Sequence, residues 1–221
     1  MPRLRTLLEW SAILIPLLIL GFFLFNFVFG APAAVPSGLP GNGGFFQVPL
    51  APSQQYSKSS GDWSFTLKSD YAYTLAGKVV GRNEYPATMP DGIIALDLAV
   101  ANGDLLTNNN LQFFTFEMGY RTLKYSYDVP AYTGLTEEYI DEHISNNHLV
   151  FLDPALESDV KQAKVGDCVI IKGKLVDIAG ASPFKQYLVN TSTVRNDAYP
   201  EGCEIILVES FTTVNCGDRP E

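Results

Sequence analysis

The chain has 221 residues and a net charge of −9 at neutral pH. Nucleic acids and anionic lipid headgroups attract basic surfaces, so this acidic balance excludes nucleic acid as an expected partner and argues against tight docking on lipid headgroups. Three cysteines allow at most one internal disulfide, which excludes a disulfide-rich scaffold.

The N-terminal run over residues 10–30 contains no charged side chain. A helix needs about 20 apolar residues to cross a bilayer core of roughly 30 Å. Arg3 and Arg5 precede the run, and the next basic residue is Lys58. The positive-inside bias therefore predicts a single-pass helix in the cell (inner) membrane, with residues 1–9 in the cytoplasm and the C-terminal bulk in the periplasm or outside the cell.

A cleaved signal peptide is the alternative interpretation of this run, because Ala31-Pro32-Ala33 resembles a cleavage site. The apolar region of a signal peptide is about 7–15 residues long, and this run is longer, so we favour the uncleaved anchor. The same domain is exported whether the run is an uncleaved anchor or a cleaved signal peptide. The anchor makes the membrane a partner of the chain, and it makes another membrane protein a candidate partner.

Residues 31–61 are dominated by Pro, Gly and Ser and show no apolar period. This composition predicts a linker that is extended where it is rich in Pro and flexible where it is rich in Gly. We expect the exported β-rich domain over residues 62–216 and a short tail over residues 217–221.

Strand patterns begin after the predicted linker. Residues 63–68 alternate between apolar and polar side chains, and residues 71–82 continue in the same style. Residues 93–103 are ambiguous, because a short apolar run cannot be assigned from its period alone. Further strand patterns cover residues 111–118, 121–129, 165–178, 183–194 and 203–214.

Two short helices are predicted among these strands. Thr136 precedes a run of acidic residues that suits the positive end of a helix dipole. Asp153 and Pro154 suit the start of a second helix, ending near residue 163. The pattern favours a mainly β (α+β) fold, either a small OB-like or SH3-like barrel or a sandwich, with one or two short helices inserted. A glycine within a long strand, Gly173, suits a barrel corner.

Five segments carry a resemblance to a known group of proteins. They read DLAVANG (97–103), YRTLKYSY (120–127), ISNNHLVF (144–151), VKQAKVGDCVIIKGKLVDI (160–178) and STVRNDAYPEGCEIILVE (192–209). In this order they resemble uncharacterised bacterial single-pass membrane proteins with an exported OB/SH3-like β domain and the pattern DLAxxxG, NxHL, GDxVxxxGxLV and CE. The chain departs at Leu123-Lys124-Tyr125, where the group has a tryptophan-rich strand, and at Phe151, where it has proline. The resemblance implies an architecture and no activity.

The cysteine positions leave the disulfide pairing open. Cys203 and Cys216 flank the predicted strand over 204–214, which would span roughly 30 Å at about 3.3 Å per residue. If that strand is straight, these two cannot pair. A bridge from Cys168 to either partner and no bridge at all remain open.

The two histidines do not suggest a metal site. His143 and His148 are five residues apart, which on one helix places them about 140° out of register. We therefore expect no metal and no cofactor. The pattern predicts His143 as a solvated helix end, and His148 as a residue that orders a turn together with Asn146 and Asn147.

Convincing catalytic motifs are absent from the sequence, which has no G-x-S-x-G. A Cys203–His148 pair, with Glu204 or Asn146 as the orienting group, is the candidate for thiol hydrolysis. Cys203 as a small apolar residue that opens a core strand is the favoured interpretation. Paired carboxylates for glycoside hydrolysis are a second catalytic candidate.

Four residues are candidates for a shared ligand pocket: Arg121, His148, Arg195 and Glu204. Structural ion-pair or turn roles are the default for Arg121 and Arg195, and also for Asp97 and Asp167. We therefore predict a membrane-anchored, non-enzymatic binding or assembly module. An exported hydrolase is the alternative, and a sensor domain that signals through a partner is a third hypothesis.

Overall fold

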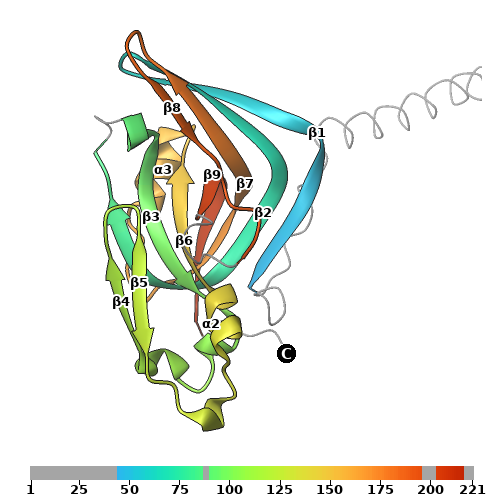
Figure 1. The fold of residues 1–221 in the computed structure, drawn as a ribbon, viewed down its shortest axis with the longest axis vertical. Coiled ribbons are helices and arrows are strands. Elements are labelled where there is room, and N and C mark those ends of the chain that lie inside the picture. Colours follow the sequence, from blue (N-terminus) through green and yellow to red (C-terminus); the bar gives the residue numbers. More distant parts are fainter. Residues whose placement is uncertain (1–43, 87–89, 196–202, 217–221) are drawn as a thin grey trace, which may run out of the picture. The chain divides into compact units, whose positions relative to one another are not determined.

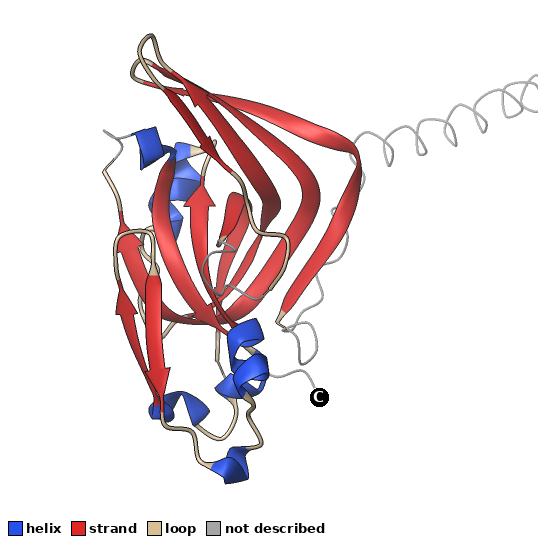
Figure 2. Cartoon of the chain, in the orientation of Figure 1, coloured by secondary structure: helices blue, strands red, loops and turns tan. Residues whose placement is uncertain are grey.

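The computed structural model describes residues 44–86, 90–195 and 203–216. As predicted, the fold is mainly β, with a seven-stranded sheet and a separate two-stranded sheet (Figure 1). The strands are β1 (Phe45–Ser60), β2 (Trp63–Glu84), β3 (Ile94–Ala101), β4 (Phe114–Met118), β5 (Leu123–Tyr127), β6 (Ile144–Val150), β7 (Cys168–Ala181), β8 (Gln186–Val189) and β9 (Glu204–Val214). The helices are α2 (Glu137–His143) and α3 (Pro154–Val160), and short 3₁₀ turns cover Pro90–Ile93, Gly103–Leu106, Asn110–Phe113 and Ala131–Thr133 (Figure 2).

Five strands of the large sheet form a closed ring. The sheet runs in the order β1-β2-β3-β6-β9-β7-β8, and β2 also pairs with β7. The ring is therefore β2-β3-β6-β9-β7 and back to β2. Neighbouring strands within the ring are antiparallel, except for β6 and β9, which are parallel. Because β2 has 22 residues, its Ser64–Lys78 part can pair with β7 while its Lys78–Glu84 part pairs with β3.

The bend predicted at Gly173 coincides with a shift in the register between β7 and β9. A Cβ atom at this position would collide with the backbone carbonyl of Leu207 on β9. Glycine therefore lets the two strands approach where the sheet coils, which a closed ring of few strands requires.

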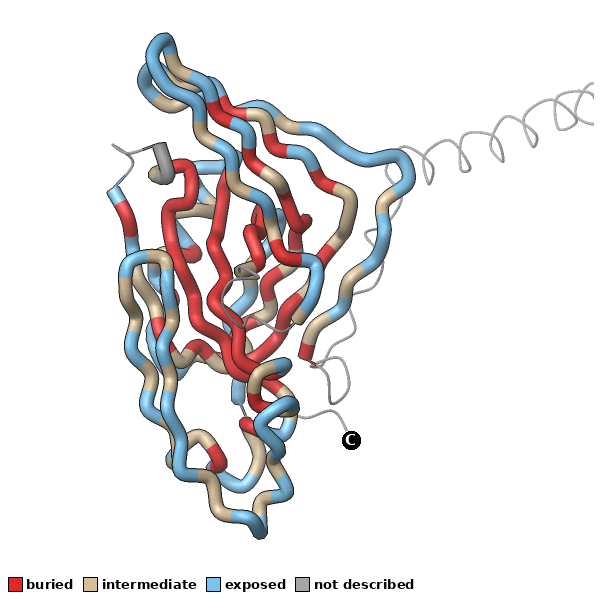
Figure 3. Tube along the Cα trace, viewed as in Figure 1, coloured by how far each residue is buried: buried red, intermediate tan, exposed pale blue. Residues whose placement is uncertain are grey.

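The largest apolar cluster, here called the ring core, draws side chains from all five ring strands. It includes Leu75 of β2, Leu98 of β3, Leu149 of β6 and Ile206 of β9, and Val160 of α3 packs into it. The residues of β3 and β6 are buried along the whole length of both strands, on both faces (Figure 3). These two strands are therefore covered outside the ring as well as inside it.

The β4–β5 hairpin supplies part of this outer cover. Its apolar face carries Phe114 and Phe116 on β4 and Tyr125 and Tyr127 on β5, and the rings contact one another. Most of these side chains join a cluster with residues of β3, β6 and α2, including Ala101. The hairpin thus folds back onto the strands between which it is inserted.

Both predicted helix starts are confirmed. The Thr136 hydroxyl accepts a hydrogen bond from the Tyr139 amide at the start of α2, and an Asp153 carboxylate oxygen accepts one from the Ala155 amide at the start of α3. Pro154 occupies the first turn of α3, where no amide hydrogen is needed.

The linker predicted over residues 31–61 is wrong for its second half, because β1 occupies residues 45–60 and pairs with β2 over most of its length. The sequence of β1 contains Pro49 and Pro52, which hide its strand character but suit a strand at the edge of a sheet. Residues 31–43 lie outside the described residues. The membrane helix predicted over 10–30 lies outside them too, and within the described ranges no helix is long and apolar enough to cross a membrane.

The predicted environments of both histidines are wrong. His143 ends α2 and is buried rather than solvated, since its ring stacks on Tyr139 and its Nδ1 lies 2.7 Å from the Tyr139 carbonyl oxygen. His148 lies within β6 and not in a turn. The polar residues 145–147 make this strand hard to predict from the sequence, because buried strands usually consist of apolar residues.

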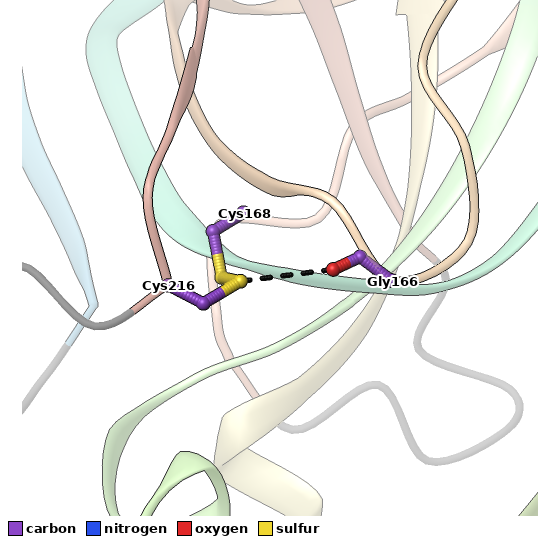
Figure 4. Close-up of a disulfide and its surroundings, with 3 residues drawn as sticks. All are labelled: Gly166, Cys168 and Cys216. Atoms are coloured by element: carbon purple, nitrogen blue, oxygen red, sulfur yellow. Dashed lines mark hydrogen bonds between the residues drawn. A yellow bond between two sulfur atoms is a disulfide. The ribbon is translucent and has the colours of Figure 1, made fainter.

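A disulfide joins Cys168, the first residue of β7, to Cys216, which lies just beyond β9 (Figure 4). The Cα atoms are 5.2 Å apart, and the bridge closes a loop over 48 positions. The Cys216 sulfur lies 3.6 Å from the Gly166 carbonyl oxygen. A disulfide sulfur has no proton, so this is a polar contact. Cys203 stays outside the bridge.

We expect Cys216→Ser to lower the free energy of unfolding by about 2–4 kcal/mol, because it removes the constraint on a loop of this length in the unfolded chain. Urea unfolding under non-reducing conditions measures the loss. Cys203→Ser is the matched control and should change stability much less. Equal losses in the two variants would show that the bridge contributes little.

Candidate functional site

Asp97 is the centre of a buried polar network, here called the Asp97 cluster. It is fully buried on β3. Its Oδ1 accepts a hydrogen bond from Arg121 Nη1 at 2.9 Å and lies 2.7 Å from His148 Nδ1, while its Oδ2 accepts one from the Tyr85 hydroxyl at 2.9 Å. One carboxylate therefore binds a guanidinium, an imidazole and a phenol.

Arg121 reaches this carboxylate from the turn between β4 and β5. Its φ angle is +56°, a left-handed conformation that side-chain-bearing residues rarely adopt. Its backbone amide donates to the Tyr85 hydroxyl at 2.9 Å, its Nη2 donates to the Ile94 carbonyl at 2.8 Å, and its guanidinium lies 3.6 Å from the centre of the Tyr85 ring. These contacts offset the backbone strain and hold the hairpin turn against β3.

Burial raises the pKa of Tyr85 to about 12, with the neighbouring Asp97 carboxylate adding to the shift. The Arg121 backbone amide and guanidinium oppose it. The phenol therefore stays protonated over the physiological range and acts as a hydrogen-bond donor to Asp97.

Glu204 is the centre of a second network, here called the Glu204 cluster. It begins β9 and is 1% exposed. Its Oε1 accepts hydrogen bonds from Arg195 and, at 3.4 Å, from the Tyr73 hydroxyl. Arg195 Nη1 also donates to the Tyr73 hydroxyl at 3.0 Å, and its guanidinium lies 4.6 Å from the centre of the Phe45 ring. Arg195 thus ties the segment after β8 to β1, β2 and β9.

A pair of buried acceptors lies beside this network. Asn147 is opposite Glu204 in the β6–β9 ladder, so both side chains point to the same face. The Asn147 amide nitrogen donates to the Leu98 carbonyl at 3.1 Å, which turns its Oδ1 away. Among the described residues neither Asn147 Oδ1 nor Glu204 Oε2 has a hydrogen-bond donor.

The four candidate residues from the sequence fall into two pairs. Asp97 and His148 alternate with residues of the ring core, so they point away from it, whereas Glu204 shares the face of Ile206, which belongs to the core. Arg121 with His148 and Arg195 with Glu204 therefore lie on opposite faces of the β3–β6–β9 sheet. A shared pocket for all four is not formed.

Two phenols that are not among the candidate residues from the sequence, Tyr85 and Tyr73, complete the clusters. Tyr85 is 12 residues from Asp97, and Tyr73 is 131 residues from Glu204. A tyrosine in a strand pattern carries no signal of such a role. The default structural role proposed for Asp167 matches its contact, because its carboxylate accepts a hydrogen bond from the Lys164 amide at 2.8 Å in the turn before β7.

The chemistry available in the Asp97 cluster is limited. A carboxylate that orients an imidazole is one part of a nucleophile-activating arrangement. Here the same Oδ1 also binds the Arg121 guanidinium. The Cys203 sulfur lies 3.8 Å from the Asn146 amide nitrogen. Across the described ranges, no three His, Cys, Asp or Glu side chains are grouped closely enough to hold a metal ion.

Arg121→Leu leaves the Asp97 carboxylate buried without its guanidinium. We expect a loss of about 3–5 kcal/mol in the free energy of unfolding, since breaking a buried ion pair strands a charge. The control is Lys68→Ala, which removes the exposed ion pair with Asp70 on β2. Chemical denaturation of both variants should show the large loss for Arg121 alone. A small loss there would mean that the network contributes little to stability.

The raised pKa of Tyr85 predicts alkaline destabilisation. An unfolded tyrosine releases its proton near pH 10 and the folded Tyr85 near pH 12, so its contribution is complete below pH 10 and is lost as pH rises to about 12. Unfolding measured between pH 9 and 12 should therefore give a steeper fall for the wild type than for Tyr85→Phe. Parallel curves would contradict the assignment.

Comparison with protein-family models, with curated proteins and with solved structures found no match. The resemblance to exported single-pass membrane proteins therefore stays a prediction based on the five sequence segments.

Proposed function

We propose that this chain is a membrane-anchored extracytoplasmic protein whose β domain is a non-enzymatic binding or assembly module. The observation that supports this proposal most is that the buried charged side chains of the domain are paired with one another. Arg121 with Asp97 and Arg195 with Glu204 are hydrogen-bonded pairs inside the domain, and their side chains are at most 15% exposed. Groups held in this way stabilise a scaffold and are poorly placed to react with a substrate.

We also infer that the domain is OB-like. In chain order, the ring strands β2, β3, β6, β7 and β9 are the first to the fifth. The ring therefore runs 1-2-3-5-4 and returns to 1, and its third and fifth strands, β6 and β9, are parallel. This order is that of the five-stranded OB barrel, and α3 lies between the third and fourth ring strands. Neither an SH3-like barrel nor a sandwich accounts for the parallel pair as simply.

The OB-like arrangement guides where a partner would bind. OB domains bind oligonucleotides and oligosaccharides on the face of their second and third strands. In this chain those strands are β3 and β6, and both are buried along their whole length beneath the chain's own insertions. A partner would therefore use another surface, and the acidic net charge disfavours nucleic acid.

Two features support export. The disulfide between Cys168 and Cys216 suits an oxidising compartment, because such bridges are rare in the cytosol. The uncharged run over residues 10–30, preceded by Arg3 and Arg5, supports an anchor in the cell membrane with this orientation.

The alternative function is an exported hydrolase that uses Cys203 with His148, or a carboxylate. One observation favours it, because His148 Nδ1 lies against Asp97 and this contact orients the ring. Arg121 Nη1 donates to the same carboxylate oxygen, so Asp97 is shared between the guanidinium and the imidazole.

The proposed function predicts that the full chain, carrying a C-terminal tag, is recovered with the membrane fraction and retains a stoichiometric protein partner after detergent solubilisation. Cys203→Ala should retain that partner equally, because a binding module needs no thiol. Recovery in the soluble fraction or without any stoichiometric partner would contradict the proposal. Hydrolytic activity of the wild type that Cys203→Ala abolishes would support the alternative.

A further inference from the structure

We propose that the interior of the ring holds a specific binding site for one water molecule, between Asn147 of β6 and Glu204 of β9. The site, here called the bridge site, consists of two oxygen atoms, Asn147 Oδ1 and Glu204 Oε2. Both atoms are buried, and among the described residues neither has a hydrogen-bond donor. Asn147 is 0% exposed and Glu204 is 1% exposed, so bulk solvent does not reach them.

The register of β6 and β9 brings the two side chains of the bridge site together. Asn147 and Glu204 are the first pair of the parallel ladder, and they share the inward face with Leu149 and Ile206 of the ring core. Neighbouring strands lie about 4.8 Å apart. A molecule that donates two hydrogen bonds of about 2.8 Å at a tetrahedral angle spans roughly 4.5 Å between its acceptors. One water molecule therefore matches the spacing of the two strands.

The orientation of the Asn147 amide is determined by its neighbours. Its Nδ2 donates to the Leu98 carbonyl at 3.1 Å, to the Ser145 hydroxyl at 2.9 Å and to the Ser145 carbonyl at 3.3 Å. A flipped amide would place Oδ1 against two carbonyl oxygens, which have no hydrogen to donate. The Oδ1 atom therefore faces the bridge site as an acceptor.

The Glu204 side chain adds a second acceptor. Its Oε1 accepts hydrogen bonds from Arg195 Nη1 and from the Tyr73 hydroxyl. The ion pair with Arg195 requires a carboxylate, and a carboxylate accepts hydrogen bonds at both oxygens and donates none. The bridge site thus has two acceptors side by side and needs a molecule with two donors.

Charge and size restrict the ligand further. The Glu204 carboxylate repels an anion. A metal cation needs more ligands than two oxygens, and the Arg195 guanidinium already supplies a positive charge at this carboxylate. An organic molecule is too large for a site whose two residues are at most 1% exposed. Water is small and neutral and has two donors, and buried waters in proteins bind polar groups that lack other partners.

The water gives the two buried oxygens the donors that they need, and an acceptor buried without a donor destabilises the folded state. It also connects β6 to β9 where β9 begins, in the parallel pair of the ring. Through Oε2 it holds the carboxylate so that Oε1 meets Arg195. This inference does not rest on the proposed function, because neither a binding module nor a hydrolase uses the bridge site.

The direct test is a crystal structure of the full chain, purified in detergent. We expect one water oxygen within about 3.2 Å of both Asn147 Oδ1 and Glu204 Oε2. A hydrogen bond made directly between the two side chains, a metal ion in place of the water, or no density between the two oxygens would each overturn the proposal.

A second test counts waters in solution, since oxygen-17 relaxation dispersion detects water molecules that stay bound for longer than nanoseconds. In Glu204→Gln the Arg195 donor keeps the amide oxygen at the position of Oε1, so the new NH2 group can donate to Asn147 Oδ1 itself. We expect this variant to have one long-lived water fewer than the wild type.

The matched control for the solution test is Glu209→Gln, at a carboxylate that is 49% exposed and paired with Lys174. It should leave the number of long-lived waters unchanged. An unchanged number in Glu204→Gln, or an equal loss in Glu209→Gln, would contradict the bridge site. The crystallographic test uses the wild type, so it decides the proposal even where Glu204→Gln does not fold.

Discussion

The ladder between β2 and β7 is the interaction on which the remaining structure depends. It runs from Ser64 paired with Ala181 to Lys78 paired with Cys168, and it is the contact that turns an open sheet into a ring. Strand closure removes edges from five strands and surrounds the ring core on all sides. The disulfide fixes one end of this ladder. Cys168, the first residue of β7, pairs with Lys78 at that end and is bound to Cys216 beyond β9.

Closure also determines where polar groups can be placed. A carboxylate buried in the wall of the ring must find its hydrogen-bond partners in the protein. Asp97 finds them on the outer face in the hairpin turn, and Glu204 finds them on the core face in the segment after β8. Each arginine comes from a connecting segment, so each ion pair fastens a loop to the barrel. The charges therefore specify the positions of loops that the apolar core does not contact.

The class of fold and most strands could be predicted from the sequence, because a strand pattern is a local property of residues such as the alternating run 63–68. The sequence predicts β2 as two strands and does not predict β1 or β6, for physical reasons. Proline hides an edge strand, and a buried strand that reads Ser-Asn-Asn-His resembles a turn. Among the candidate residues, arginines and acids could be named, but their pairing could not. Asp97 and His148 are 51 positions apart, and only the register of β3 and β6 makes them neighbours.

The chain's own segments cover this barrel unevenly. The β4–β5 hairpin and α2 pack on the outer face of β3 and β6, so that face is not accessible to a ligand. At the other end of the sheet, β1 has β2 on one side and leaves Phe46 and Val48 without cover within the described residues. The chain therefore closes both faces of β3 and β6, whereas the strand outside the ring keeps apolar side chains at the surface.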